Sequence, residues 1–165
     1  MAAGDSITVS GVTYYQFLVF PSLWSKFNAG VAGTTISDML ASAPSSVDSH
    51  YDRTRLGIVS ILGGTNGCGT VAASTQWSQL QSFSAARHAV GWKTIVMTIP
   101  PQASGCDAAL NDLIRANWVG TFDAMADLGA HLTLGDLSDG IHPTPAAQQN
   151  IIAPLVQAAI NSLIP

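Results

Sequence analysis

Two apolar runs constrain the fold of this chain more than any other feature of its sequence. Residues 56–62 (LGIVSIL) are nearly all apolar and end in glycines, and residues 93–99 (KTIVMTI) are mostly apolar and end in two prolines. A strand that is apolar along its whole length, rather than at alternate positions, is buried on both faces. Such strands are typical of a parallel sheet covered by helices on either side. The two runs therefore predict an α/β fold.

The rest of the chain supplies the other expected elements. The spacing of apolar residues predicts helices over 12–20 (ending at Pro21), 35–42, 74–90, 106–126 and 145–163. Shorter strands are expected at 1–3, 24–28 and 130–134. Strands and helices thus alternate in a chain of 165 residues, a length that suits a single domain over 1–165. We expect a three-layer α/β/α arrangement around a parallel five-stranded sheet.

Composition excludes several classes of partner. Net charge is −4, all ten acidic residues are Asp, and the six Lys and Arg residues are scattered singly. Nucleic-acid binding needs clustered basic residues, so no nucleic-acid partner is expected. No run approaches the roughly 18 apolar residues of a membrane span. A charged fraction of only 10% on a surface rich in Ser, Thr, Asn and Gln suits a secreted protein, which we expect to be a monomer.

Polar blocks follow the expected strands, and two of them carry the residues of a nucleophilic site. The blocks are Gly4–Thr8 (GDSIT), Asn28–Thr34 (NAGVAGT), Gly63–Gly67 (GGTNG) and Asp139–Thr144 (DGIHPT). In a parallel sheet, loops at the carboxyl ends of strands meet at one edge. A serine hydroxyl is a weak nucleophile that needs a base within hydrogen-bond reach. Ser6 could find that base in His142, which Asp139 could orient from three residues upstream.

The four blocks, in this order and at these spacings, resemble the GDSL or SGNH hydrolase superfamily of serine esterases and lipases. The resemblance extends from Gly4 to the C-terminal helix. It implies a flavodoxin-like sheet with strand order 2-1-3-4-5. It also implies a catalytic triad in which Ser6 is the nucleophile, His142 the base and Asp139 its acidic partner. The other three histidines are more typical of solvated or core-packing side chains.

The same resemblance implies an oxyanion hole with three donors. These are the backbone N–H of Ser6, the backbone N–H of Gly33 and the side-chain amide of Asn66. The chain departs from the family pattern at Gly67, where an Asp is usual, and this departure puts the rigidity of the Asn66 loop in question. Asp5 is expected to shape the turn before Ser6 rather than to take part in the chemistry.

The resemblance implies hydrolysis of a small-molecule acyl ester. The expected walls of the acyl site include Ile7, Cys68 and Ile141, whose small or apolar side chains favour a short to medium acyl group. A carbohydrate O-acetyl ester or a thioester is an alternative substrate of the same site. No cofactor is expected, and no metal either, because the chain contains no Cys-x-x-Cys or His-x-x-x-His pair.

Three questions stay open at this stage. Cys68 and Cys106 each follow a glycine in a loop after an expected strand, so they are either a disulfide or two free thiols. Only three residues precede Gly4, so either a longer precursor was trimmed or the first strand is short. A phosphate- or nucleotide-binding flavodoxin-like module is the alternative function, with the loop Gly63–Gly67 as the anion site, but it leaves the Ser, His and Asp residues unexplained.

Overall fold

The computed structural model describes residues 1–20 and 24–165, which form a parallel sheet between two layers of helices. The strands are β1 (Ala2–Gly4), β2 (Ile58–Leu62), β3 (Lys93–Met97) and β4 (Ala124–Ala126), and they lie in the order β1-β2-β3-β4. Every pairing is parallel, with Ala2 opposite Ser60, Ser60 opposite Ile95 and Ile95 opposite Ala124. The α/β class and the parallel sheet expected from the apolar runs are therefore confirmed.

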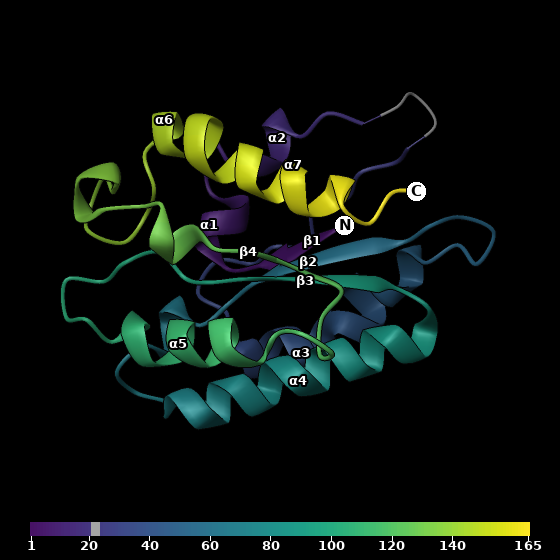
Figure 1. Ribbon diagram of the computed structural model, residues 1–165, viewed down its shortest axis with the longest axis horizontal. Helices are drawn as coiled ribbons and strands as arrows, with labels where there is room; N and C mark the ends of the chain where they lie inside the picture. Colours follow the sequence, from purple (N-terminus) through teal and green to yellow (C-terminus); the bar gives the residue numbers. More distant parts are fainter. Residues whose placement is uncertain (21–23) are drawn as a thin grey trace.

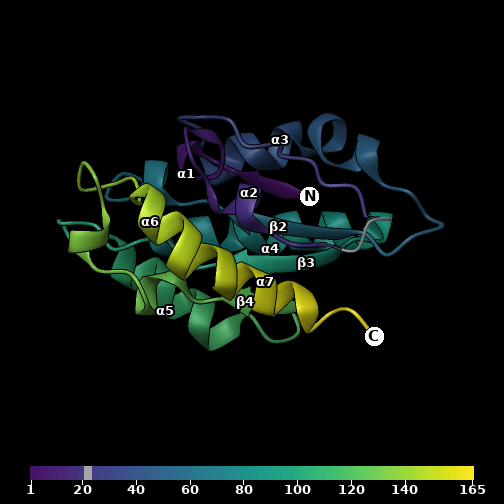
Figure 2. The same ribbon diagram turned by 90° about the horizontal axis from the view of Figure 1, so that it is seen from above.

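Helices cover both faces of the sheet (Figure 1). One layer holds α3 (Ile36–Ser46), α4 (Ala73–Val90) and α5 (Asp107–Asn117). The other holds α1 (Ser6–Val9), α2 (Tyr14–Phe17), α6 (Pro145–Ala147) and α7 (Ala153–Asn161), with the π-helical turn η5 (Gln148–Ile152) between the last two. Viewed from above, the last helix crosses the strands diagonally (Figure 2). Short 3-10 helices lie at Asp48–His50, Thr65–Gly67, Leu128–Ala130 and Leu134–Asp136.

The core lies between these layers, as the apolar runs predict. All five residues of β2 are buried, and so are four of the five residues of β3. Helix α4 adds Trp77, Leu80 and Phe83 to this core, as the spacing of its apolar residues predicts. No helix among the described residues is both long and apolar enough to span a membrane.

Two predictions for this part of the chain are wrong. Residues 130–134 do not form the fifth strand, and the helix expected over 106–126 is shorter. Helix α5 ends at Asn117, because the carbonyl of Trp118 accepts hydrogen bonds from the N–H groups of Thr121 and Phe122. Gly120 supplies the positive φ of 81° that this turn needs. The strand is Ala124–Ala126. Its sequence, AMA, has no β-branched residue and is too short to show an alternation, so only its pairing with β3 defines it.

The expected second strand at 24–28 is reduced to one parallel bridge, between Asn28 and Ala2. Ala2 donates its N–H to the Phe27 carbonyl and accepts from the N–H of Ala29, which makes a single rung. The described residues thus form a sheet of four strands rather than five. The helix expected over 12–20 is the single turn α2, and Pro21, its expected end, lies outside the described residues.

The junction of β1 and α1 leaves no room for a side chain at position 4, which generates a stability prediction. A Cβ on Gly4 would overlap the side chain of Thr8 and lie 2.9 Å from the Leu62 carbonyl oxygen. We expect Gly4→Ala to lower the free energy of unfolding by about 3 kcal/mol through overpacking. Urea unfolding measures this loss, and a loss below about 0.5 kcal/mol would contradict the crowding. Gly135→Ala is the matched control, since its nearest neighbour would be the Thr133 hydroxyl at 3.6 Å.

Candidate active site

Ser6 lies at the carboxyl end of β1, as the first residue of α1. Asp5 caps this helix, and its Oδ1 accepts a hydrogen bond from the N–H of Ile7 at 3.0 Å. The Gly-Asp pair therefore does two things: Gly4 lets strand and helix approach closely, and Asp5 ends the strand and starts the helix. The result places the Ser6 hydroxyl at the edge of the sheet.

The structure brings His142 and Asp139 to this serine. The Ser6 Oγ and His142 Nε2 are 2.8 Å apart, and His142 Nδ1 lies 2.7 Å from Asp139 Oδ2. The other oxygen of Asp139 accepts from the backbone N–H groups of His142 and Ile141, at 2.7 and 3.0 Å. Because a carboxylate faces Nδ1, that nitrogen carries the proton and Nε2 is free to accept one from Ser6. All three predicted triad residues are thus in contact.

Asp139 is exposed to solvent and accepts three hydrogen bonds, and both conditions favour its ionised form. Hydrogen bonds from the His142 N–H, the His142 ring and the Ile141 N–H lower the pKa of this carboxyl to about 2. The carboxylate is therefore charged throughout the pH range in which a histidine can act as a base. Among the described residues, the other His–Asp pair is His88 with Asp123, but His88 uses the same Nε2 for Asp123 and for the buried Thr94 hydroxyl.

A residue that the sequence analysis missed holds the two ends of the chain together behind the triad. Gln148, buried in the π-helical turn, accepts from the Tyr14 N–H at 2.8 Å and donates to the Ile7 carbonyl at 3.1 Å. Its amide thereby ties the helix after His142 to the helices that carry and follow Ser6. The only signal in the sequence was a glutamine at an inward position of an apolar helix, and its partners are more than 130 residues away.

Two loops place the expected oxyanion donors next to each other. Gly33 has a positive φ of 79°, and Asn66 lies in the 3-10 helix after β2. The Asn66 side chain donates to the Thr34 carbonyl at 2.9 Å, so one N–H of its amide links the two loops and the second remains available. No turn, loop or capping bond between described residues uses the N–H of Ser6 or Gly33.

The glycine at position 67, where the family pattern has Asp, has a local explanation. Gly67 is buried, and a Cβ there would lie 2.7 Å from Oε1 of Gln76. The Gln76 side chain occupies this space and donates to the Gly67 carbonyl at 3.3 Å. Two hydrogen bonds therefore hold this loop without an Asp. Gln76 donates to the Gly67 carbonyl, and Asn66 donates to the Thr34 carbonyl.

Cys68 and Cys106 form a disulfide, which answers the question left open by the sequence. Their Cα atoms are 5.4 Å apart. The bond joins the loop that carries Asn66 to the residue that caps α5. It closes a loop with a sequence separation of 38 residues.

The expected substrate-binding residues divide into two groups. Ile141 is 41% exposed beside His142, and the half-buried Cys68 lies two residues after Asn66. Ile7 is only 1% exposed, because its side chain points into the core beneath α1. It therefore cannot line an open acyl site, and that expectation is wrong.

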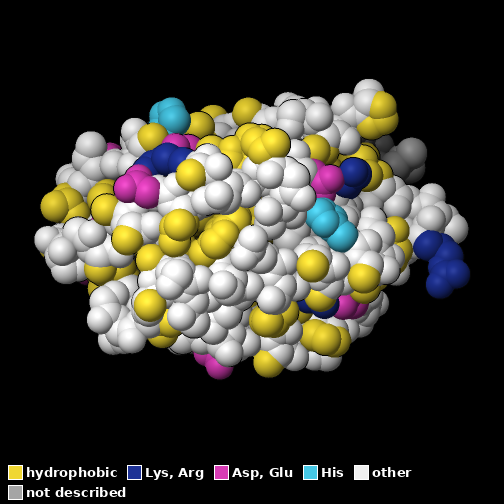
Figure 3. Space-filling model, turned by 60° about the horizontal axis from the view of Figure 1, so that its bottom comes forward, with side chains coloured by type: hydrophobic (Ala, Val, Ile, Leu, Met, Phe, Trp, Pro, Cys, Tyr) yellow, Lys and Arg dark blue, Asp and Glu magenta, His cyan; other side chains and the backbone are white. Residues whose placement is uncertain are grey.

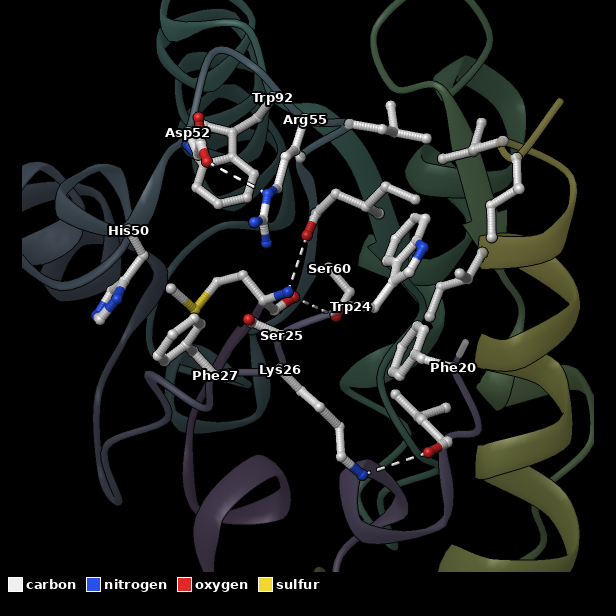
Figure 4. Close-up of a pocket in the computed structure, with 18 of the residues that line it drawn as sticks. Phe20, Trp24, Ser25, Lys26, Phe27, His50, Asp52, Arg55, Ser60 and Trp92 are labelled. Carbon is white, nitrogen blue, oxygen red and sulfur yellow. Dashed lines mark hydrogen bonds and ion pairs between the residues drawn. The ribbon is translucent and has the colours of Figure 1, made fainter. Parts of the chain in front are cut away.

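The large cavity among the described residues lies away from the triad. Its volume is about 880 Å³, and Figure 4 shows aromatic side chains, including Trp24, Phe27 and Trp92, around it. Met1 lines it, and the amino group of this residue donates to the Ile58 carbonyl and has its pKa lowered to about 6 by burial. Both chain termini lie at this end of the molecule (Figure 1). Ser6, Asp139 and His142 do not line this cavity, so it is not the acyl pocket of this site.

Charged side chains are sparse on the surface. On the face shown in Figure 3, the basic side chains stand singly or beside acidic ones, and no basic patch is visible there. Lys93, for example, pairs with Asp123 at 2.8 Å, and Arg115 pairs with Asp127 at 2.8 Å. This pattern agrees with the absence of clustered basic residues in the sequence.

Comparison with known proteins gives matches in structure alone. No protein-family model matches the chain, and no curated protein sequence does. TesA aligns with a TM-score of 0.79 at 20% identity, over 99% of this chain and 98% of that one. A carbohydrate esterase family 3 structure from Talaromyces cellulolyticus has a TM-score of 0.75 at 21% identity, with 99% and 96% covered. A GDSL-like lipase from Bacteroides thetaiotaomicron VPI-5482 has 0.72 at 16%, with 99% and 87% covered.

These likenesses define the fold as that of the GDSL or SGNH hydrolases. The resemblance seen in the sequence is thereby confirmed at the level of the fold. The sequence identities are too low to carry an activity across, so the chemistry must be argued from the side chains themselves.

The Gln148 contacts generate a prediction. We expect Gln148→Leu to lower the free energy of unfolding by about 2–4 kcal/mol, because it leaves two buried backbone groups without a partner. It should also lower kcat, since the segment after His142 loses its link to α1. Urea unfolding and ester hydrolysis measure the two effects.

Gln157→Leu is the matched control for this variant. Gln157 lies on α7 and accepts from the N–H of Val19 at 2.8 Å, but this contact is exposed to solvent. Its loss should change stability by less than about 1 kcal/mol. If both variants changed the free energy of unfolding and kcat equally, the prediction that the buried Gln148 contacts hold the site together would be contradicted.

Proposed function

We propose that this protein is a serine esterase that hydrolyses carboxylic esters with a short to medium acyl group through an acyl-enzyme. The observation that carries the proposal is the continuous hydrogen-bonded series from Ser6 Oγ to His142 to Asp139. The esterase and lipase structures that share the fold support the same chemistry.

The geometry supports a two-step reaction. His142 takes the proton of Ser6 as the serine oxygen attacks the ester carbonyl, and Asp139 stabilises the imidazolium that forms. The imidazolium gives this proton to the leaving alkoxide, and an acyl-serine remains. A water molecule then attacks the acyl-serine, with His142 again as base, and releases the carboxylic acid and free Ser6.

The tetrahedral intermediates carry a negative oxygen that needs donors fixed in advance. We assign this role to the N–H groups of Ser6 and Gly33 and to the second N–H of the Asn66 amide. The hydrogen bond from Asn66 to the Thr34 carbonyl supports this assignment, because it fixes the amide without using its whole donor capacity.

The surroundings of the triad favour a small acyl group. Ile141 is exposed beside His142, and Val31, whose N–H donates to the Gly4 carbonyl, is 56% exposed near the end of β1. Such side chains offer apolar contact without a deep enclosure. A carbohydrate O-acetyl ester fits this description as well as a simple ester does, and a thioester would use the same steps.

The disulfide suits an exported protein, so we propose secretion.

Replacement of the triad tests the proposal directly. We expect Ser6→Ala and His142→Ala each to lower kcat/KM for a small aryl ester by at least 10³-fold, since triad members act as a unit. A fluorophosphonate probe should label the wild type and not Ser6→Ala. His88→Ala is the control, and it should keep its activity. Activity within tenfold of wild type in Ser6→Ala would remove Ser6 as the nucleophile. A wild type that is neither labelled nor active on esters would exclude the esterase and favour a binding module.

A second test addresses the oxyanion hole. We expect Asn66→Ala to lower kcat by about 10²–10³ with little change in KM, because the donor acts mainly in the transition state. Asn66→Asp should be at least as harmful, because it places negative charge where negative charge develops. A turn residue would tolerate Asp, so near-wild-type kcat for Asn66→Asp would limit the hole to two backbone donors. Asn117→Ala, which removes an exposed amide on α5, is the control.

A further inference from the structure

Asn66 and Gly67 form a chemically reactive pair, and the proposed esterase reaction does not involve this reactivity. The side-chain amide of an asparagine can be attacked by the backbone nitrogen of the residue that follows it. Glycine offers the least hindered nitrogen, because it has no Cβ and its backbone reaches conformations that other residues avoid. Asn66 is also exposed, so water reaches its amide.

Packing keeps a glycine at position 67. The Gln76 side chain is 4% exposed, and its amide donates to the carbonyls of Gly67 and Val71 at 3.3 and 3.1 Å. A Cβ at position 67 would lie only 2.7 Å from Oε1 of this glutamine. A side chain that would shield the peptide nitrogen of residue 67 therefore does not fit, and Asn66 keeps a reactive neighbour.

The folded loop restrains the reaction through two hydrogen bonds and one covalent bond. The N–H of Gly67 donates to the Gly64 carbonyl at 3.0 Å, within the 3-10 turn, and the Asn66 amide donates to the Thr34 carbonyl at 2.9 Å. Attack requires both bonds to break and the chain around Asn66 to rotate. The disulfide at Cys68 limits that motion. The rate therefore depends on how often the loop opens.

We propose that Asn66 is a site of spontaneous deamidation, whose rate is set by the opening of its loop and whose product is an inactive esterase. The loss of activity rests on the proposed role of Asn66 as an oxyanion donor. The modification itself does not, because it needs only the Asn-Gly pair and water.

The reaction proceeds in two steps without an added reagent. The Gly67 nitrogen loses its proton and attacks Cγ of Asn66, the Cγ–Nδ2 bond breaks, and Nδ2 takes up a proton and leaves as ammonia. The product is a cyclic succinimide. Water then adds to either carbonyl of the ring and breaks the bond between that carbon and the Gly67 nitrogen. One amide and one water molecule thus become one carboxylic acid and one ammonia.

Both products of the second step damage the oxyanion hole. Opening at Cγ leaves the main chain through its original carbonyl group and gives an aspartate isomer, and opening at that carbonyl leaves an ordinary peptide bond through Cγ. In either case a carboxylate replaces the amide donor at position 66, where negative charge develops during the reaction. We expect the converted molecules to have a kcat at least about 10²-fold lower, as for loss of one oxyanion donor.

Ageing of the intact protein tests the proposal. Wild type is incubated at pH 8, and samples are assayed for ester hydrolysis, then reduced, digested with trypsin and analysed by mass spectrometry. The peptide 56–87 contains Asn66 as its one asparagine. The fraction of this peptide converted to the acid should rise with the same time constant as activity falls. The peptide 27–53 is the internal control, since Asn28 is exposed but is followed by an alanine, and it should keep its amide.

A second comparison tests control by the loop. The full chain unfolded in guanidinium chloride should convert at Asn66 at least about tenfold faster than the folded protein. The double variant Cys68→Ser and Cys106→Ser should convert at a rate between these two, because its loop opens more often. If this variant does not fold, wild type with its disulfide reduced by dithiothreitol takes its place.

The outcomes separate this inference from the proposed function. No conversion at Asn66 in the folded or the unfolded chain, with Ser6→Ala inactive, would overturn the inference and leave the esterase in place. Equal rates in the two states would overturn the control by the loop. Converted molecules carry an added negative charge, so ion exchange isolates them. Full activity of that fraction would overturn the inactivation and the donor role of Asn66, while the triad would stand.

Discussion

The buried amide of Gln148 is the contact on which the geometry of the site depends. Ser6, the proposed nucleophile, lies near the start of the sequence, and His142, its proposed base, lies 136 residues later. Their 2.8 Å separation therefore requires that the first and last segments be held in register. Gln148 provides this with one acceptor and one donor, both used by backbone groups of the N-terminal helices. Loss of either hydrogen bond would be costly, because the amide is buried and water cannot replace the lost partner.

The π-helical turn that carries Gln148 has a cause in the sequence. Pro154 lacks an N–H and cannot continue a regular helix from the residues before it. The chain accommodates the proline by widening the helix over Gln148–Ile152 before α7 begins. The proline and the Gln148 contact thus lie in neighbouring turns of the same helical segment, and π-helical turns are frequent at functional sites.

The sequence was informative where a residue type and a spacing determine the structure directly. The runs at 56–62 and 93–99 predicted buried strands, and Ser6, Asp139 and His142 could be predicted because nucleophilic chemistry restricts the choice of side chains. The strand Ala124–Ala126 could not be predicted, since its three residues have no β preference and depend on β3 for their conformation. Ile7 was misplaced for a related reason: a one-turn helix has too few residues to show which face is inward.

Asp139 and Asp5, the carboxyl groups next to His142 and Ser6 respectively in their loops, have opposite environments. Asp139 accepts three hydrogen bonds at the surface, and its pKa is lowered to about 2, whereas Asp5 accepts one in the interior, and its pKa is raised to about 6. Burial and hydrogen bonding, rather than residue type, set this difference. Active sites that need several protonation states often separate identical side chains in this way.

The disulfide between Cys68 and Cys106 also affects how the protein tolerates cleavage. The segment between these residues includes α4, β3 and the partly exposed loop at 101–105. A protease that cuts one peptide bond in this segment leaves two fragments that stay covalently joined, with Ser6 and Asn66 on one and His142 on the other. The nicked molecule keeps its residues in a single covalent unit, and only reduction lets its two parts diffuse away from each other.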